Sequence, residues 1–115
     1  MTDARIVFTS TDSAEKAQAL ARALVERRLA ACVNIVDRAQ SIYRWQGAIE
    51  SATEWLLLIK TQASLLPQLE SALRALHSYT LPELLVLTVE SGSEEYLRWM
   101  EQCLQSETHA QVKRQ

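Results

Sequence analysis

Hydrophobic and β-branched residues dominate the middle of the chain, between residues 30 and 61. The first arm of this stretch runs to Trp45, and the second begins at Ile49 and ends in the almost wholly apolar run 55–59. Valine, isoleucine, tyrosine and tryptophan suit a pleated, half-buried surface, and Gly47 between the arms takes a positive φ without steric cost. The pattern predicts a long β-hairpin.

The length of this hairpin has a structural consequence. An arm of roughly 14 residues at about 3.3 Å per residue is about 46 Å long, whereas a compact chain of this size has a diameter of roughly 35 Å. The ribbon therefore overhangs its own domain and carries Ile42, Tyr43, Trp45 and Ile49 toward its tip. Isolated ribbons are marginally stable in water, so we expect a second copy of the chain to cover these side chains. The alternative is a bulge near residues 37–39 that folds the ribbon onto its own core.

The segment before the hairpin predicts a strand and a helix. Residues 5–10 are a short β-rich run typical of a buried central strand. Asp12 and Glu15 have the spacing of a capping box, in which Asp12 caps the helix and Glu15 reaches back. Apolar residues then recur at three- and four-residue steps from Ala14 to Val25, which predicts an alanine-rich helix that can lie close to a sheet.

Two more helices and a strand follow the hairpin. Leucines at 66, 69, 73 and 76 predict a second helix, with Ser64 as its cap and Pro67 in its first turn. Residues 83–89 form a nearly continuous apolar run, which predicts a central strand covered on both faces. We expect Ser93 to cap a third helix and residues 105–115 to be a mobile tail or an arm ordered by a partner chain. The buried face of the third helix is expected to hold Tyr96, Trp99, Met100 and Cys103.

The predicted order of elements is strand, helix, strand, strand, helix, strand, followed by one helix. This is the split βαβ order of an α+β domain, and right-handed crossovers place both of the first two helices on one face of a four-stranded antiparallel sheet. The other face of the sheet is left bare. We expect residues 1–115 to form one such domain, and we expect a closed three-fold ring to cover the bare face and the hairpin.

Composition excludes several classes of protein. The chain is 48% hydrophobic and 23% charged with a formal net charge of -2, which excludes disorder as its main state and argues against broad capture of nucleic acid or an anionic membrane. Cys32 and Cys103 lie far apart without a metal-binding spacing, and the sequence has neither a membrane-spanning apolar run nor a signal-peptide pattern. We expect a reduced, cytoplasmic protein with no nucleic-acid or membrane partner.

The sequence carries no strong catalytic signature, so we expect it not to be an enzyme. A glycine-rich phosphate loop is excluded because Gly47 and Gly92 are the only glycines. His77 precedes Tyr79 and Glu83, so an imidazole, a phenol and a carboxylate could converge near one helix end. The alternative is a histidine that only closes that helix.

Other residues allow both a binding and a structural interpretation. Lys60 interrupts the apolar end of a strand, so it must extend to solvent or meet a carboxylate or a ligand anion. Tyr43, Trp45 and Glu50 place aromatic area and charge near the hairpin tip, where packing between subunits is commoner than ligand binding. Cys32 lies in an apolar strand, where we expect a small buried hydrophobe rather than a redox or metal group.

Five segments of the chain carry a family resemblance. They read LAACVN (29–34), SIYRWQGAIE (41–50), LIKT (58–61), HSYTLPEL (77–84) and YLRW (96–99). Together they resemble the CutA family of divalent-cation tolerance proteins, over nearly the whole chain from Ile6 to Leu104. The resemblance implies a ferredoxin-like subunit in a tight homotrimer similar to PII-type signalling trimers, and a cytoplasmic protein linked to copper and other divalent metals. It does not imply a known reaction.

The resemblance also implies a ligand pocket at the subunit cleft and limits its metal chemistry. Family members usually have proline at the position of Ser78, and those thought to hold copper have a cysteine and a histidine where Thr9 and Leu76 stand here. His77 alone remains, whereas Cu(II) requires several donors. We expect Cu(II) or another divalent cation to bind weakly, to be shared between subunits, or not to bind. The candidate pocket residues are Tyr43, Trp45, Glu50, Lys60, His77, Tyr79 and Glu83.

Two functions remain open at this point. The first is a non-enzymatic homotrimer that takes part in tolerance of copper and other divalent metals. The alternative is a small-molecule sensor of the PII type that acts through a partner protein and holds an anionic ligand with Lys60 and Arg44. Stabilisation of the protein by an anionic metabolite without metal would favour the sensor.

Overall fold

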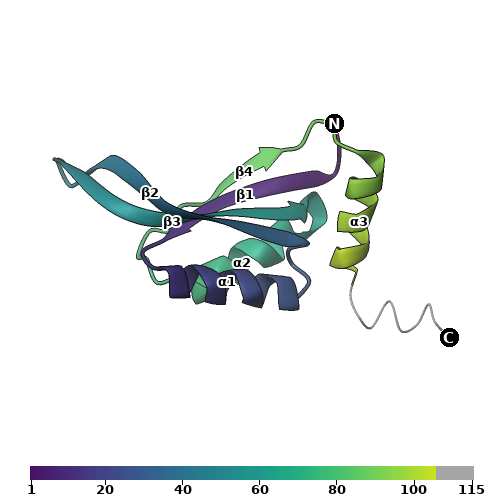
Figure 1. Cartoon of the computed structure of the whole chain (residues 1–115), viewed down its shortest axis with the longest axis horizontal. Coiled ribbons are helices and arrows are strands. Elements are labelled where there is room, and N and C mark those ends of the chain that lie inside the picture. The colour runs from purple at the N-terminus through teal and green to yellow at the C-terminus, as the bar shows by residue number, and fades with distance from the viewer. Residues whose placement is uncertain (106–115) are drawn as a thin grey trace.

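Four antiparallel strands form one sheet in the order β2-β3-β1-β4, as the computed structural model of residues 1–105 shows (Figure 1). The order of elements is the predicted one, with a helix after β4. The strands are β1 (Ala4–Thr11), β2 (Cys32–Trp45), β3 (Ala48–Gln62) and β4 (Leu85–Thr88). The helices are α1 (Ala14–Glu26), α2 (Leu66–Leu76) and α3 (Glu94–Leu104), and a 3-10 turn (Ala63–Leu65) precedes α2.

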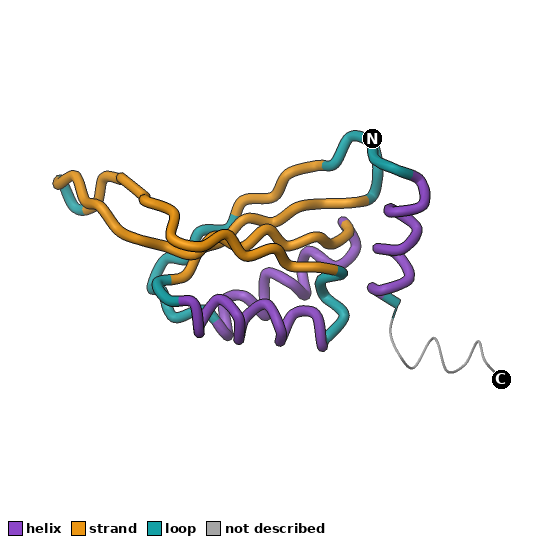
Figure 2. Tube along the Cα trace, in the orientation of Figure 1, coloured by secondary structure: helices purple, strands orange, loops and turns teal. Residues whose placement is uncertain are grey.

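The core lies between the sheet and the two helices α1 and α2, which cover the same face (Figures 1 and 2). Ala17 is fully buried, so α1 approaches the strands closely, as its alanine stripe predicts. A second, smaller cluster lies where Met100 and Leu104 of α3 pack against Ala4 and Ala31. The largest fully buried apolar side chains are Val7, Leu24, Leu57, Ile59, Leu69 and Leu73.

The β2–β3 hairpin is confirmed and extends beyond the rest of the sheet. Its strands meet at the pair Trp45 and Ala48, and Gln46 (φ 50°) and Gly47 (φ 83°) form the turn. Two successive positive φ angles are typical of the type I′ turn, whose twist matches that of the strands. Only the inner half of β3, from Trp55 to Gln62, pairs with β1, so the outer half projects away from the domain (Figure 1). The molecule measures 58 × 27 × 23 Å.

A bulge interrupts the hairpin at the place where the alternative interpretation of the sequence puts one. The register of β2 on β3 shifts between Val36 and Ala39, and Arg38 has a positive φ of 51°. The bulge bends the ribbon but does not fold it onto the core, because Ile42 remains 72% exposed and Ile49 69% exposed. The chain therefore does not cover its own hairpin.

Two predictions about burial are wrong. β4 is an edge strand rather than a central one, and Leu85 and Leu87 are 61% and 50% exposed. On α3, Tyr96 and Trp99 are exposed, whereas Met100 is buried as predicted. In both elements large apolar side chains lie on surface that the chain leaves uncovered, and periodicity alone does not distinguish such surface from core.

Two predicted helix caps are also corrected. Ser13, not Asp12, is the N-cap of α1, and its side chain accepts a hydrogen bond from the Lys16 amide at 3.1 Å. The Asp12 carboxylate instead forms an ion pair with Lys16 at 3.0 Å. Ser64 lies within the 3-10 turn and does not cap α2, although Pro67 does stand in the first turn of that helix.

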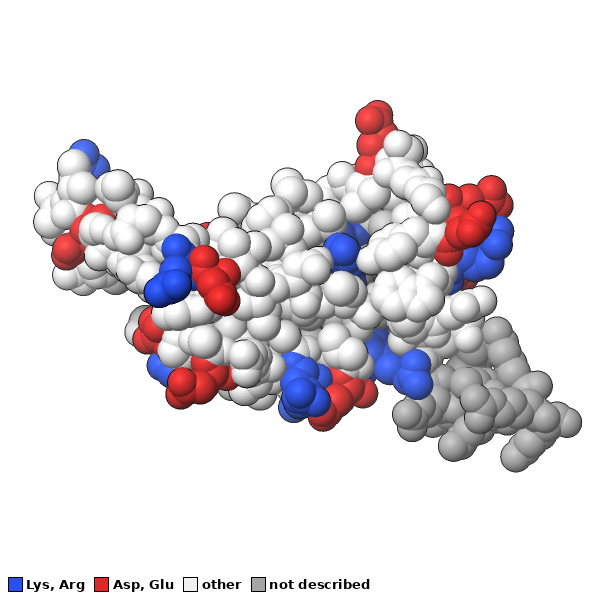
Figure 3. All heavy atoms as spheres, in the orientation of Figure 1, with Lys and Arg blue, Asp and Glu red and all other residues white. Residues whose placement is uncertain are grey.

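Charged side chains form no large basic surface in the view of Figure 3. Acidic and basic groups alternate along the side formed by the helices, and uncharged surface extends from the hairpin across the strands (Figure 3). None of the helices within residues 1–105 has the length and hydropathy needed to cross a membrane. The predicted tail, residues 105–115, lies outside the described residues except for Gln105.

Candidate functional site

A groove of about 950 Å³ separates the outer half of the hairpin from the segment that joins α2 to β4. The overhang and the bulge of β2 position one wall, and the extended residues before Pro82 position the other. The groove therefore lies beside the projecting part of the fold rather than within the core. Its lining residues are Ser10, Ser41, Ile42, Tyr43, Trp45, Ala52, Glu54, Ser78, Tyr79, Thr80, Leu81, Pro82, Glu83, Leu84 and Leu85.

Glu54 is the centre of a hydrogen-bond network at the inner end of this groove. Its Oε2 atom accepts hydrogen bonds from the Tyr79 hydroxyl at 2.9 Å and from the Ser10 hydroxyl at 3.0 Å. The three residues come from β3, from the α2–β4 segment and from β1. Two donors on one oxygen hold the half-buried carboxylate in a fixed orientation.

Hydrogen bonds of His77 connect the α2–β4 segment to β1. Its Nε2 lies 2.7 Å from the Ser10 carbonyl oxygen, and the Tyr79 amide donates to its Nδ1 at 3.1 Å. A carbonyl only accepts, so Nε2 carries the hydrogen and Nδ1 is the acceptor. The rings of His77 and Tyr79 are 4.9 Å apart. Both ring nitrogens are thus engaged, and a metal ion could coordinate His77 only by displacing one of these bonds.

The electrostatic environment of the groove is negative. Burial, the hydrogen bond to Glu54 and the charges of Glu54 and Asp12, with Tyr43 nearby, raise the pKa of Tyr79 well above its ordinary value. Tyr79 is therefore a neutral hydrogen-bond donor throughout the physiological range. Burial and, to a lesser extent, the charge of Glu54 raise the pKa of Glu83. Two carboxylates thus face the same space.

The structure brings four of the seven predicted site residues into the groove, namely Tyr43, Trp45, Tyr79 and Glu83. His77 lies next to them through its contact with Tyr79. Glu50 and Lys60 lie outside the lining of the groove.

Lys60 lies on the opposite side of the sheet from the core and is directed to α3. Its Nζ donates to the Tyr96 hydroxyl at 3.2 Å and lies 5.4 Å from the centre of the Tyr96 ring. Cys32, its pairing partner on β2, is half-buried rather than enclosed in the core. Within one subunit Lys60 therefore has an aromatic partner instead of the predicted carboxylate or anion.

Sequence reasoning missed Glu54 and Ser10. The available signal was weak: Glu54 is a single acid immediately before an apolar run, and Ser10 is a polar residue at the end of an apolar strand. Their sequence separations from the residues they contact, 44 between Ser10 and Glu54 and 25 between Glu54 and Tyr79, exceed any local motif.

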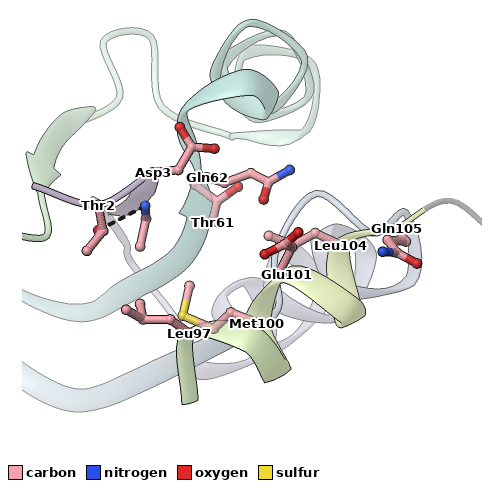
Figure 4. Close-up of a pocket in the computed structure, with 10 residues that line it drawn as sticks. Thr2, Asp3, Thr61, Gln62, Leu97, Met100, Glu101, Leu104 and Gln105 are labelled. Carbon is pink, nitrogen blue, oxygen red and sulfur yellow. Dashed lines mark hydrogen bonds between the residues drawn. The ribbon is translucent and has the colours of Figure 1, made fainter. Parts of the chain in front are cut away.

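A second hollow, of about 480 Å³, lies between α3 and the N-terminal residues (Figure 4). Asp3 and Glu101 contribute its carboxylates, and Leu97, Met100 and Leu104 form its apolar side (Figure 4). The lining contains neither histidine nor cysteine among the described residues. It offers no catalytic or metal-binding combination.

The donors of this chain do not fit a tight copper site. Within residues 1–105 no group of three or more histidine, cysteine, aspartate or glutamate side chains is placed to hold a metal ion. His77, the predicted ligand, already uses both ring nitrogens.

Comparison with known proteins decides the family. Residues 5–103 match the family described as CutA1 divalent ion tolerance protein. The chain belongs to the CutA family. Its sequence is 48% identical over 95 residues to the divalent-cation tolerance protein CutA of Thermus thermophilus, covering 83% of this chain and 92% of that protein. This family is named for a tolerance rather than for a reaction.

Further CutA relatives agree in sequence and in fold. Protein CutA of Mus musculus is 44% identical over 99 residues, 86% of this chain, but the match spans only 56% of that longer protein. The crystal structure of CutA from Xylella fastidiosa superposes with a TM-score of 0.88 at 40% identity, over 90% of this chain and all of that one. These comparisons confirm the predicted ferredoxin-like fold.

Proposed function

We propose that this CutA protein acts as a homotrimer in the tolerance of divalent cations, copper among them. The observation that carries the proposal is the uncovered apolar surface of the sheet together with the overhanging hairpin. We call the sheet face opposite α1 and α2 the open face. It consists of Ile6, Phe8, Leu56, Leu58, Leu85 and Leu87, which alternate with the residues directed toward the helices.

The open face is continuous across three strands. Phe8 of β1 lies opposite Leu58 on one side and Leu85 on the other, and Ile6 lies opposite Leu87. An apolar face of this kind on a folded chain typically marks a contact between proteins. The outer edges of β2 and β4 are also unpaired within residues 1–105, which favours association edge to edge.

A three-fold ring uses both features at once. Each hairpin projects beyond its own sheet, so in a ring it can lie across the next subunit and place the exposed Ile42 and Ile49 against another copy. Lys60 lies on the same side of the sheet as the open face, so a neighbouring subunit would also approach Lys60. The groove beside the hairpin then becomes a cleft at a subunit boundary.

We further propose that copper binds this chain weakly and that His77 is the residue it contacts. His77 would have to release the Tyr79 amide or the Ser10 carbonyl, and this cost keeps the affinity low. Titration with Cu(II) against a competing chelator tests this proposal. Stoichiometric, sub-micromolar binding that His77→Ala abolishes would contradict it.

The second candidate function is a PII-like sensor that acts through a partner protein. The large groove beside the hairpin favours it, because ligand sites are usually preformed hollows with a few fixed polar groups. The anionic ligand expected at Lys60 and Arg44 is not supported within one subunit, since neither residue lines the groove. A thermal-shift screen with metals and with metabolites separates the two functions.

We propose a non-catalytic role in the cytoplasm. Cys32 and Cys103 are both free thiols, as is usual in a reducing compartment. Measuring the redox state of both thiols in cells by alkylation tests the location: full oxidation would contradict it.

A further inference from the structure

The groove between the hairpin and the α2–β4 segment has a charge pattern that the metal-tolerance role leaves unexplained. Among the described residues that line it, Glu54 and Glu83 are the ones that carry charge at neutral pH, and none is a lysine or an arginine. Asp12, at the end of β1, adds a smaller negative contribution near Tyr79, because its carboxylate is paired with Lys16 at 3.0 Å. The field within the groove therefore attracts cations.

Glu54 is oriented so that one oxygen remains available to a ligand. Both internal hydrogen bonds, from Tyr79 and Ser10, reach Oε2. No donor within residues 1–105 reaches Oε1. A carboxylate with one oxygen fixed and the other unoccupied is preorganised to accept a hydrogen bond from a cationic donor.

The rest of the wall is mainly aromatic and apolar, with hydroxyl groups contributed by Ser10, Ser41, Ser78 and Thr80. Tyr43 and Trp45 come from β2, Tyr79 and Leu81 from the opposite wall. Aromatic faces attract ammonium and guanidinium groups, and they supply no ligand atoms to a metal ion. A divalent ion would need several oxygen or nitrogen donors, and no group of three such residues exists in the described chain.

We infer that this groove binds a small organic cation, a primary ammonium or guanidinium compound, through Glu54 and Glu83 and between walls that carry Tyr43, Trp45 and Tyr79. The cation donates hydrogen bonds to the two carboxylates, and its alkyl part covers the aromatic rings. The inference rests on the proposed function only in taking this groove as the ligand site, and it requires no copper.

The pKa of Glu83 supports this assignment. Burial and the nearby Glu54 charge raise that pKa, so Glu83 ionises less readily than an ordinary glutamate. A bound cation favours the ionised form. Affinity should therefore rise with pH until Glu83 is fully ionised and should fall as Glu83 is protonated.

Binding to the full chain by calorimetry and two-dimensional NMR tests the inference. The probes are butylguanidinium and butylammonium, with neutral butanol, anionic butyrate and Mn(II) as comparisons. Saturable binding of both cations is expected at about pH 7.5, with several-fold weaker binding at about pH 4, because the raised pKa of Glu83 favours its neutral form there. Binding of butyrate or butanol as tight as that of the cations, or of Mn(II) alone, would overturn the inference.

Three variants make the test specific. Glu54→Gln and Glu83→Gln should each weaken cation binding at least tenfold. Glu83→Gln leaves the hydrogen bonds of Glu54 intact, so it remains informative if Glu54→Gln fails to fold. Glu101→Gln, the same substitution at an exposed site on α3, should leave binding unchanged. Equal affinities in all three variants would refute the site.

The native mass of the same samples separates this inference from the proposed assembly. If the protein is a trimer that binds neither cation, for example because a neighbouring subunit fills the groove, the inference is refuted and the proposed function stands. If the protein is a monomer that binds both cations, the proposed trimer is refuted and the inference stands.

Discussion

At the scale of single residues, Glu54 and Tyr79 connect the two walls of the groove. Their hydrogen bond joins the hairpin to the α2–β4 segment, and the acceptor is a half-buried carboxylate. Tyr79→Phe removes the donor and leaves the ring. The free energy of unfolding should fall by about 1–2 kcal/mol, since hydrogen bonds to charged groups contribute more than neutral ones.

Urea denaturation at a fixed protein concentration measures this loss, because association would make apparent stability depend on concentration. Tyr43→Phe is the matched control: Tyr43 is 44% exposed, and its hydroxyl has no hydrogen-bond partner within residues 1–105. Equal losses in the two variants would mean that the Tyr79 hydroxyl contributes nothing specific.

The raised pKa of Glu83 makes the stability of the folded chain depend on pH. Its pKa is higher in the folded chain than in the unfolded one, so the folded state binds the proton more tightly and stability is lost as pH rises through the folded pKa. Glu83→Gln removes this loss. The variant should be more stable than the parent at neutral pH, by less than about 1 kcal/mol because the carboxylate is partly exposed.

Thermal denaturation from acid to neutral pH measures this difference. The gain from Glu83→Gln should shrink on acidification and vanish below the ordinary pKa of a glutamate. A gain that is constant across the range would show that charge is not its cause.

The site residues divide clearly into predictable and unpredictable ones. Tyr79 and Glu83 could be assigned because they follow His77 closely in the chain. Glu54 and Ser10 could not, because their partners are brought near only by strand pairing and by the return of the chain after α2. The sequence places Lys60 in the candidate pocket, and within residues 1–105 its Nζ donates to the Tyr96 hydroxyl on α3.

At the scale of elements, the start of α1 tests how local capping works in this chain. Ser13 accepts from the Lys16 amide, so Ser13→Ala should cost about 1 kcal/mol of stability. Asp12→Ala removes only an ion pair whose two side chains are each 51% exposed, and it should cost less than about 0.5 kcal/mol. Chemical denaturation of both variants compares them. A larger loss for Asp12→Ala would restore the predicted capping box.

Helices and strands with a periodic pattern could be predicted from the sequence. Whether their apolar residues are buried or exposed could not. The hairpin, its bulge and α1 follow from local sequence, because turn residues and period fix them. β4 reads as a central strand since four consecutive residues are nearly all apolar, yet it lies at the edge of the sheet. The same apolar residues would serve equally well as core or as an interface, and only the tertiary arrangement distinguishes these roles.

At the scale of the whole molecule, the uncovered hairpin and the open face point to the same cause. Ile42 and Ile49 are about 70% exposed, and Leu85 and Leu87 are at least half exposed. Burying such side chains contributes roughly 1.5–3 kcal/mol each. A chain that leaves this much apolar surface in water would gain stability by associating. The fold could be predicted from one sequence because it follows from local patterns, whereas an assembly depends on surfaces that only the tertiary structure brings together.

Sedimentation equilibrium of the full chain at micromolar concentration tests the proposed assembly most directly. Three chains of 13.0 kDa give a trimer of 39 kDa, and this account predicts that mass as the main species. A stable single chain of 13.0 kDa that keeps its fold on dilution would contradict it.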